Sequence, residues 1–478
     1  MDNIPVPQGR IRRTMPLAGF TARAAGGRMV AALREKAGDT DAVAHFHEKT
    51  AERYAELLGH SKGVLMKAGQ ILSMVDTSNV GSGGFSPYQK ALYRLQAQAP
   101  PMDPALAKQV LHADLGRTVE EIFAEFSDDP IAAASIGQVH RAVLHDGRQV
   151  AVKIQYPGAA EAIRADLANT ELLATFFRII CSASGTTMPD LRQAAHEITA
   201  RITEEIDYRH EAANIIAFSE LYRDHPFIRV PQLIDAACGN RVLTMTYLDG
   251  LDWAAAQHAD QDLKNTWAEV IWRFSGGNQR HANLFHADPH PANCRFGADG
   301  RVGFVDFGCV KTIPEHQRGR LIGLSRAVIE KRKRDVRDLM AELGYFAEGL
   351  TLSVDEAYQW MAEIHYEVLA AQPVTYDQAT SQRAVSALVD VRLSSDHPVR
   401  RVTIPGDLIF FSRINLTTNA ILATLGATVH ARSIVDDMDG VAEPTTPLGK
   451  QHDAWVRQRD LPHGLEHHDT PNAAPHLA

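Results

Sequence analysis

Apolar residues recur every three or four positions along several stretches of the chain, and this spacing predicts amphipathic helices. The first two stretches run from Asp41 to Val75 and from about Pro87 to Ala97. The doublet Pro100-Pro101 follows them and predicts a domain boundary, because consecutive prolines interrupt a helix. Helical spacing returns in residues 159–181, in residues 190–221 and in most of the chain beyond residue 250.

Alternation of apolar and polar residues predicts strands in three other places. Residues 136–143 and 150–154 flank the turn Asp146-Gly147, which is typical of a β-hairpin. Residues 241–247 predict a single strand, and residues 294–305 predict a second hairpin around Ala298-Asp299-Gly300. The pattern therefore combines a few short strands with many helices.

Composition excludes some classes of protein. The 478 residues include 49 Lys and Arg against 58 Asp and Glu, and the net charge of −9 argues against a nucleic-acid binder. The four cysteines form no Cys-x-x-Cys pair, which favours a reducing, cytoplasmic setting. No membrane span is predicted, because the longest charge-free stretch, residues 414–431, is rich in threonine and asparagine.

The two ends of the chain differ from the rest. The first 38 residues carry seven basic and two acidic side chains, so they predict either a mobile basic arm or an arm that contacts anionic lipid or an acidic partner. Residues 443–478 contain five prolines and five histidines with little periodicity, which predicts a disordered tail. The expected parts are an arm (1–40), a helical extension (41–100), a β-rich part (101–248), a helical part (249–442) and the tail (443–478).

Lys153 lies in the second strand of the first predicted hairpin. Alternation places it on the same face as Ala151, and the apolar residues between and beside them on the opposite face. This arrangement suits a nucleotide cleft, because alanine leaves room for the base and lysine meets phosphate oxygens. The alternative is an ordinary solvent-exposed lysine on a strand.

Two later segments have the spacing of a phosphoryl-transfer site. Residues 286–293 read His-x-Asp-x-x-x-x-Asn, in which Asp288 would face the attacking group and Asn293 would hold a metal ion. Asp306 then begins Asp-Phe-Gly at the end of an apolar strand, as a Mg²⁺–phosphate site requires. Together with Lys153, these residues predict a kinase-like ATP site.

Two parts of a conventional protein kinase are absent from the sequence. No Gly-x-Gly-x-x-Gly precedes Lys153, and alanines predict a stiffer loop that approaches phosphates differently. The residues in its place are Ala132, Ala133, Ala134 and Ser135. No Ala-Pro-Glu follows Asp306, and a helical pattern resumes by about Pro314, so a peptide-docking platform is not expected.

An acidic stretch in the predicted helix 201–214 has two interpretations. Its carboxylates belong to Glu204, Glu205, Asp207 and Glu211. They either form a solvated face, where like charges four residues apart repel slightly, or supply one partner to Lys153 and others to a second lysine or a metal ion. The residues alone leave both interpretations open.

Six motifs together resemble the UbiB/AarF family of atypical kinase-like proteins, over roughly residues 41–441. The motifs are Lys67-Ala68-Gly69-Gln70, the run 132–135, Val150-Ala151-Val152-Lys153, Glu205-Ile206-Asp207, residues 288–293 and Asp306-Phe307-Gly308. The resemblance implies an α+β, two-lobed protein-kinase-like fold, with a small β-rich N-lobe, a mostly helical C-lobe and a helical N-terminal extension. It also implies ATP binding with weak or conditional ATPase activity, in support of quinone-lipid biosynthesis at membranes.

The resemblance assigns a role to each site residue. ATP or ADP would bind at Ala132, Ala133, Ala134, Ser135, Ala151, Lys153 and Glu211, and Mg²⁺ would bind at Asn293 and Asp306. Glu211 would pair with Lys153. The gating residues would be Lys67, Gln70, Glu205 and Asp207, with Lys67 engaging the two carboxylates, and the catalytic residues would be Asp288, Lys153 and Lys67. The sequence departs from the family pattern at Ala292, in place of glycine, and at Cys294, in place of a bulky apolar residue.

Two functions of different class follow from these residues. The first is an Mg²⁺-dependent ATPase or a small-molecule or lipid kinase, in the cytoplasm or peripherally at the inner face of the membrane, with a quinone precursor or other lipid as partner. The second is a nucleotide-switched scaffold with negligible turnover, which presents an apolar surface to a lipid or a partner enzyme.

Overall fold

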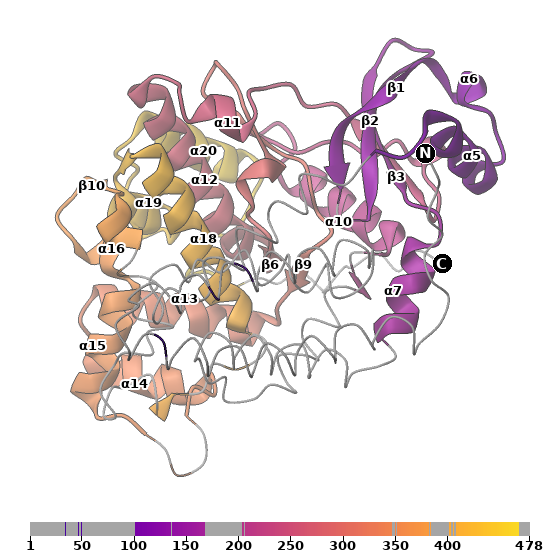
Figure 1. Cartoon of the computed structure of the whole chain (residues 1–478). Coiled ribbons are helices and arrows are strands. Elements are labelled where there is room, and N and C mark those ends of the chain that lie inside the picture. Colours follow the sequence, from indigo (N-terminus) through magenta and orange to yellow (C-terminus); the bar gives the residue numbers. More distant parts are fainter. Residues whose placement is uncertain are drawn as a thin grey trace. The chain divides into compact units, whose positions relative to one another are not determined.

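The computed structural model describes residues 101–134, 136–167, 203–204, 206–346, 349, 351–381, 383, 401–402, 405 and 408–467, with the isolated positions 34, 46 and 49. The described residues fall into two compact units (Figure 1). The first holds the residues up to Arg209 together with Ile234–Met245. The second holds His210–Leu233 and the chain from Thr246 onward. The predicted helical extension 41–100, with Lys67 and Gln70, lies outside the described residues, as do Ser135 and Glu205.

The first unit is built on a four-stranded sheet in the order β1-β2-β3-β5. Its elements are α5 (Pro104–Leu115), α6 (Val119–Ile122), β1 (Phe123–Ala134), β2 (Gly137–Leu144), β3 (Gln149–Gln155), α7 (Ala159–Leu167), the 3₁₀ turn η1 (Asp235–Ala237) and β5 (Val242–Thr246). Helix α5 begins after Asp103, whose carboxylate accepts a hydrogen bond from the Ala105 N–H at 2.8 Å.

The predicted first hairpin is confirmed. Strands β2 and β3 pair antiparallel, with Val139 opposite Lys153, and the turn between them places Gly147 at φ +86°. Val150, Val152 and Ile154 are completely buried in the core against α5 and α6, as the alternation predicts. Burial of this face fixes the register, because a slip of one residue would turn Lys153 into the core.

The second unit is mostly helical. Its helices are α10 (Tyr208–Leu221, whose first two residues belong to the first unit), α11 (Trp253–Ala256), α12 (Gln261–Ala282), α13 (Glu315–Ile329), α14 (Lys333–Glu342), α15 (Val354–Ile364), α16 (Tyr366–Leu369), α18 (Ile409–Leu425), α19 (Ala431–Met438) and α20 (Pro447–Gln458). The short strands are β4 (Ile228–Arg229), β6 (Leu284–His286), β7 (Cys294–Phe296), β8 (Val302–Phe304), β9 (Val310–Thr312), β10 (Val374–Thr375) and β11 (Thr428–Val429), with the 3₁₀ turn η2 (Pro291–Asn293). Strands β7 and β8 form the predicted second hairpin.

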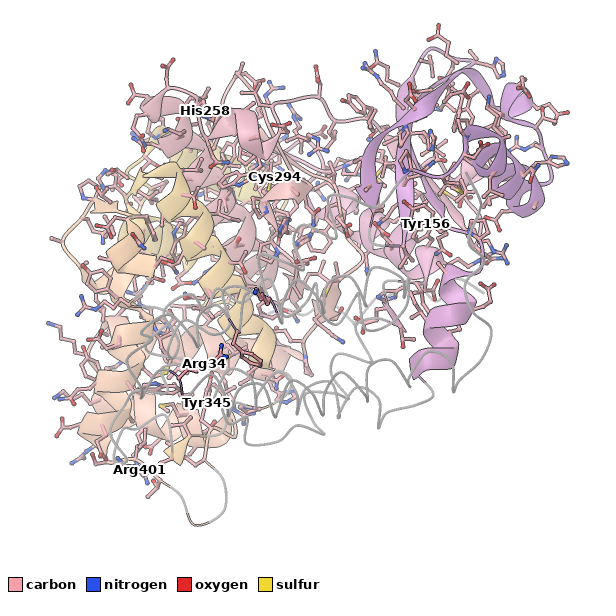
Figure 2. All side chains as sticks on the ribbon, in the orientation of Figure 1. Arg34, Tyr156, His258, Cys294, Tyr345 and Arg401 are labelled. Carbon is pink, nitrogen blue, oxygen red and sulfur yellow. The ribbon has the colours of Figure 1, made fainter. Side chains whose placement is uncertain are left out.

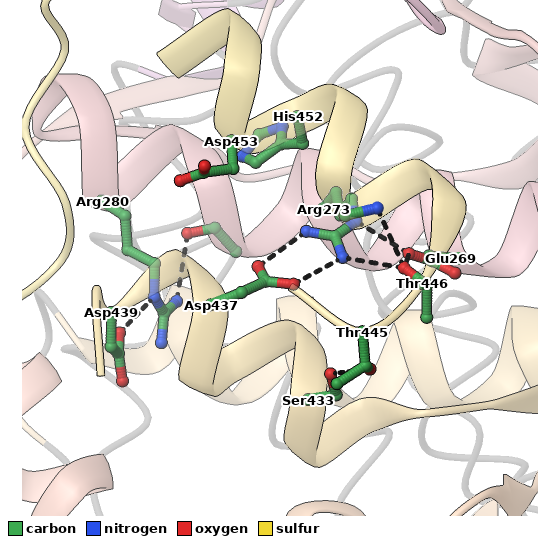
Figure 3. A network of polar contacts seen from close by, with 12 residues as sticks. Glu269, Arg273, Arg280, Ser433, Asp437, Asp439, Thr445, Thr446, His452 and Asp453 are labelled. Atoms are coloured by element: carbon green, nitrogen blue, oxygen red, sulfur yellow. Dashed lines mark hydrogen bonds and ion pairs between the residues drawn. The ribbon is translucent and has the colours of Figure 1, made fainter. Parts of the chain in front are cut away.

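Helix α12 runs through the second unit and is tied to the C-terminal part of the chain by buried ion pairs (Figure 3). The Arg273 guanidinium donates two hydrogen bonds to the Asp437 carboxylate, both at 2.8 Å, and a third to Glu269 at 2.9 Å. Two helical turns further along α12, Arg280 Nε donates to Asp439 at 2.7 Å. Two planar guanidinium groups thereby fix α19 against α12.

Residues 443–467 are ordered, so the prediction of a disordered tail is wrong there. Helix α20 begins after Thr446, whose hydroxyl accepts from the Gly449 N–H at 2.9 Å, and it buries Trp455 and Val456. The Trp455 ring stacks on Tyr222 with centroids 5.7 Å apart. The contacts of Trp455 with Tyr222 and the Arg223 carbonyl join residues more than 200 positions apart, so the local composition does not reveal them.

Two further expectations need correction. Ala132, Ala133 and Ala134 belong to strand β1 and pair with β2, so this run is not a loop. Asp207 precedes α10 and accepts from the Arg209 N–H at 3.0 Å, so it does not share a helical face with Glu211. The expected boundary at residue 248 lies three residues beyond the last change of unit, after Met245, but His210–Leu233 also belongs to the second unit.

Candidate active site

In the first unit, Lys153 is the predicted nucleotide-binding residue, and it is 9% exposed. Its ammonium group lies 5.2 Å from the centre of the Tyr208 ring, a cation–π distance. Gln155, the next residue on the same face of the strand and also buried, donates its amide to the Ile206 carbonyl at 2.9 Å. The segment just before α10 is thus attached to the end of β3, and Lys153 is held by packing instead of extending into solvent, as the alternative interpretation required.

In the second unit, the segment 286–293 runs from strand β6 into the turn η2. The Ala287 N–H donates to the Cys309 carbonyl at 2.9 Å, which extends the β6–β9 ladder by one residue up to Asp288. The His290 N–H then donates to the Asp288 carbonyl at 2.7 Å, and the Asn293 N–H to the His290 carbonyl at 2.9 Å. These two turns place Asp288 at the beginning of the loop and Asn293 at its end.

Asn293 and Asp306 are brought together by the second hairpin. The Val305 N–H donates to the Asn293 carbonyl at 3.0 Å, one step beyond the pair Cys294 and Phe304. Asp306 follows immediately, and one of its carboxylate oxygens accepts from the Gly308 N–H at 3.0 Å. The β7–β8 hairpin therefore places both predicted metal ligands at the same end of one short β-ladder.

His286 connects the loop to the Asp-Phe-Gly segment. Its Nε2–H donates to the Asp306 carbonyl at 2.5 Å, and its ring meets the Phe307 ring edge-on with centroids 5.3 Å apart. Phe307 is completely buried, and the centre of its ring lies 5.0 Å from the centre of the Phe218 ring of α10. The backbone on either side of the Asp306 carboxylate is thus fixed by one hydrogen bond and an aromatic cluster.

Helix α10 contacts the same segment through a polar side chain. Asn214 donates its amide to the Phe307 carbonyl at 2.8 Å. Glu211 lies three residues earlier on this helix and is 1% exposed. A carboxylate so deeply buried requires polar or charged neighbours. The interpretation of this stretch as a solvated acidic face therefore fails for Glu211, whereas its predicted pairing with Lys153 joins two different units and stays a prediction.

The two departures from the family pattern are accommodated by the loop. Ala292 lies within η2 and its N–H donates to His290 Nδ1 at 3.2 Å, and it is not one of the described residues with positive φ, so an alanine fits without strain. Cys294 (labelled in Figure 2) is 3% exposed, and burial raises the pKa of its thiol to about 12. Cys294 therefore acts as a small apolar residue in the hairpin.

The oxygen donors fit a magnesium ion. Mg²⁺ in phosphoryl-transfer sites binds one or two carboxylates together with substrate phosphates and water. Asp306 and the amide oxygen of Asn293 supply that kind of set, and within the described residues no group of three or more His, Cys, Asp or Glu is arranged to hold a metal alone. A site of this composition needs phosphate oxygens to complete it.

The sequence matches a known family of kinase-like domains. Residues 94–340 match the ABC1 atypical kinase-like domain, a little over half of the chain. The chain belongs to the ABC1 atypical kinase-like family. The predicted family and the α+β, two-lobed kinase-like fold class are thereby confirmed.

Several relatives within this family carry the word kinase in their names. The chain is 31% identical to the mitochondrial atypical kinase COQ8B of Rattus norvegicus, over 72% of this chain and 64% of that protein. It is 28% identical to the mitochondrial atypical kinase coq-8 of Caenorhabditis elegans, over 82% of this chain and 51% of that protein. The chloroplastic protein ACTIVITY OF BC1 COMPLEX KINASE 7 of Arabidopsis thaliana is 35% identical over 53% of this chain and 36% of its own length. The chain thus spans between about a third and two thirds of these relatives.

A solved structure shows the same fold. The complex of Rv3197 with erythromycin from Mycobacterium tuberculosis superposes with a TM-score of 0.59 at 31% identity, and it covers 85% of this chain and all of the other. Among the described helices of this ABC1-family chain, none combines the length and apolar character needed to cross a membrane.

Sequence reasoning did not identify three residues that shape the site. Asn214 and Phe218 were assigned only to a helix, and His286 was recognised only as the first position of the loop motif. Asn214 and Phe218 follow Glu211 by three and seven residues, a spacing that places all three on nearly the same side of a helix. That spacing is the one signal in the sequence that connects them with the site.

Proposed function

We propose that this ABC1-family chain binds ATP with Mg²⁺ and catalyses phosphoryl transfer, as an ATPase or as a kinase for a small molecule or lipid. The observation that supports this most directly is the hydrogen-bonded arrangement of Asp288, Asn293 and Asp306 on two adjoining β-ladders. The backbone of each of these three residues is held by hydrogen bonds, so their side-chain oxygens need little reorganisation when a nucleotide binds.

Each residue would have a separate task. Bound Mg²⁺ would neutralise charge on the transferred phosphoryl group. Asn293 and Asp306 would hold it, Lys153 would orient the phosphates, and Asp288 would position the attacking hydroxyl or water. Glu211 would pair with Lys153, and Ala132, Ala133, Ala134, Ser135 and Ala151 would line the nucleotide. Lys67 and Gln70 would gate the site together with Glu205 and Asp207.

The cellular setting is also part of the proposal. We infer a cytoplasmic protein that works peripherally at the inner face of the membrane, with a quinone precursor or another lipid as partner. This inference rests on the family resemblance and on the basic composition of the first 38 residues.

Nucleotide binding is the first test. A ligand at about 100 times its Kd stabilises a protein by about 2.7 kcal/mol, so ATP or ADP with Mg²⁺ should raise the melting temperature clearly. Asp306→Asn should reduce the Mg²⁺-dependent part of this shift. Asp299→Asn is the matched control, because Asp299 is an exposed residue in the turn of the same hairpin. No shift at millimolar nucleotide would exclude nucleotide binding and with it the proposed function.

Turnover is the second test. Phosphate release, measured with and without anionic liposomes, should be lost in Asp306→Asn and Asp288→Asn and retained in Asp299→Asn. Lys67→Ala should raise the basal rate if Lys67 gates the site, and an unchanged rate in a folded variant would remove Lys67 from the mechanism.

A nucleotide-switched scaffold is the second candidate function. The observation that favours it is the position of Ala132, Ala133 and Ala134 within a paired strand, where a kinase would have a glycine-rich loop covering the phosphates. Nucleotide-induced stabilisation without phosphate release under either lipid condition would favour the scaffold over the enzyme.

A further inference from the structure

A cavity of about 150 Å³ lies inside the helical second unit, apart from the candidate active site. Its walls come from α12, α13, α15, α16, α18 and α19 and from Tyr345, which is labelled in Figure 2. None of the residues at 286–308 lines it. An apolar cavity of this size in a protein core accepts one six-membered ring.

Most of the wall is apolar and aromatic. Trp360 and Phe411 face the cavity together with Leu324 and Ile414, and all four belong to the same hydrophobic cluster. A flat ring would contact aromatic side chains here at low cost in desolvation.

Two polar atoms in the wall have no hydrogen-bond partner in the described part of the chain. They are Oε1 of Gln279 on α12 and Oγ1 of Thr418 on α18, and their residues are 8% and 6% exposed. A buried polar atom left without a partner destabilises the folded protein, because it has lost its hydrogen bonds to water. An occupant that donates to the Gln279 oxygen and accepts from the Thr418 hydroxyl would remove this destabilisation at both atoms.

Arg280 and Glu367, two ionisable groups in the wall, each have a hydrogen-bond partner of their own. Arg280 donates to Asp439 at 2.7 Å and to the Gly276 carbonyl at 3.1 Å. Burial raises the pKa of Glu367 to about 7, and its carboxyl accepts from Asn415 at 3.3 Å. Arg280 is already neutralised by Asp439, and the raised pKa of Glu367 leaves its carboxyl partly protonated at neutral pH, so the wall favours an uncharged molecule over an ion.

From these observations we propose that the cavity binds an uncharged molecule of single-ring size that carries a hydroxyl group, which donates to Gln279 Oε1 and accepts from Thr418 Oγ1. The site is independent of the proposed nucleotide site, since the two share no residue. Because α12 continues through Asn283 into strand β6, an occupant beside Gln279 would contact the helix that leads directly to the 286–293 loop.

Calorimetric titration with phenol and with fluorobenzene, which is nearly isosteric but donates no hydrogen bond, tests the proposal. Phenol should bind with 1:1 stoichiometry and at least about fivefold more tightly than fluorobenzene. Thr418→Val should weaken phenol about fivefold to tenfold, as expected for one neutral hydrogen bond, and leave fluorobenzene unchanged. Thr424→Val, on the exposed side of the same helix, is the matched control and should change neither.

A blocking variant keeps the test decisive if Thr418→Val does not fold. Ser325→Leu places a larger apolar side chain at the cavity wall and should abolish binding of both probes. Asp306→Asn should leave phenol binding intact, so a failure of the proposed catalytic function would not imitate a failure here. Absence of saturable binding, equal affinity for the two probes, or phenol binding that survives Ser325→Leu would each overturn the proposal.

Discussion

Three buried histidines form a chain of hydrogen bonds that holds helix α20 in the second unit. The N–H groups of Phe227 and Ile228 donate to His225 Nδ1, so His225 Nε2 carries the proton that it donates to His452 Nδ1 at 3.0 Å. His452 Nε2–H then donates to His281 Nε2 at 3.1 Å, and His281 Nδ1–H donates to the Pro462 carbonyl at 2.8 Å. In this arrangement His225 and His452 each carry a single ring proton and are neutral.

The hydrogen-bonded histidines predict that the free energy of unfolding of the protein falls in mild acid. Burial lowers the pKa of His452 and of His225 well below the ordinary value of 6.5, and the neighbouring His281 lowers both further. As the pH falls through about 6.5, His225 and His452 therefore bind protons in the unfolded protein but stay unprotonated in the folded protein. Stability is complete above that pH and is lost as the pH falls towards the folded pKa values. Between pH 7.5 and 5.5 each histidine removes about 1.4 kcal/mol, and the two together about 2.7 kcal/mol.

Urea unfolding followed by tryptophan fluorescence measures this loss. All five tryptophans of the chain belong to the second unit, so the signal reports on that unit alone. His452→Gln keeps a donor and an acceptor but cannot be protonated, so its stability difference between pH 7.5 and 5.5 should be about 1.4 kcal/mol smaller than that of the unmodified chain. His258→Gln, at an exposed position, should retain the full difference. If His452→Gln shows the same pH dependence as the unmodified protein, the buried histidines are not the cause of the loss of stability in acid.

Three other changes test the packing of the two units. Trp455→Ala should cost about 3–5 kcal/mol in the free energy of unfolding, measured in urea, because it empties the space under α20; a cost below about 1 kcal/mol would mean that the helix is only loosely attached. Asp437→Asn leaves a buried guanidinium without its carboxylate and should cost about 3–5 kcal/mol by the same measurement, and an unchanged midpoint would contradict the bidentate pair. Gly137→Ala would drive a Cβ into the carbonyl of Ile154 and should destabilise the first unit by about 1–3 kcal/mol in thermal unfolding followed by circular dichroism. Gly319→Ala, which enters open space on a helix, is its control and should stabilise by up to about 1 kcal/mol.

Local chemistry explains which elements could be predicted from the sequence. Asp146-Gly147 and Asp299-Gly300 both mark turns whose flanking residues alternate, and both hairpins formed where they were expected. The spacing from Asp288 to Asn293 likewise predicted a loop whose ends the structure connects to two ladders. These features depend on neighbours within about ten residues, so the sequence pattern contains them.

Distant contacts explain what could not be predicted. Residues 443–467 have few apolar residues, and Trp455 is ordered by Tyr222 and the Arg223 carbonyl, which no local pattern reveals. The alanines at 132–134 were expected in a loop because they stand where a kinase has its glycine-rich loop, yet pairing with β2 makes them a strand. The cavity beside Gln279 is another example, since its walls come from six helices spread over more than 150 residues.

The division of the chain into interleaved units has a consequence for its synthesis. Strand β5 completes the first sheet beside β3, where the Gln155 N–H donates to the Arg241 carbonyl at 3.0 Å, but it is translated only after α10 and β4. At roughly 5–20 residues per second, β3 waits on the order of ten seconds as an open edge on the ribosome. During this interval its unpaired backbone is available to other nascent chains. A fragment that ends before Val242 would keep that edge permanently, and expression of the first unit alone therefore requires residues 234–245 to be joined to it.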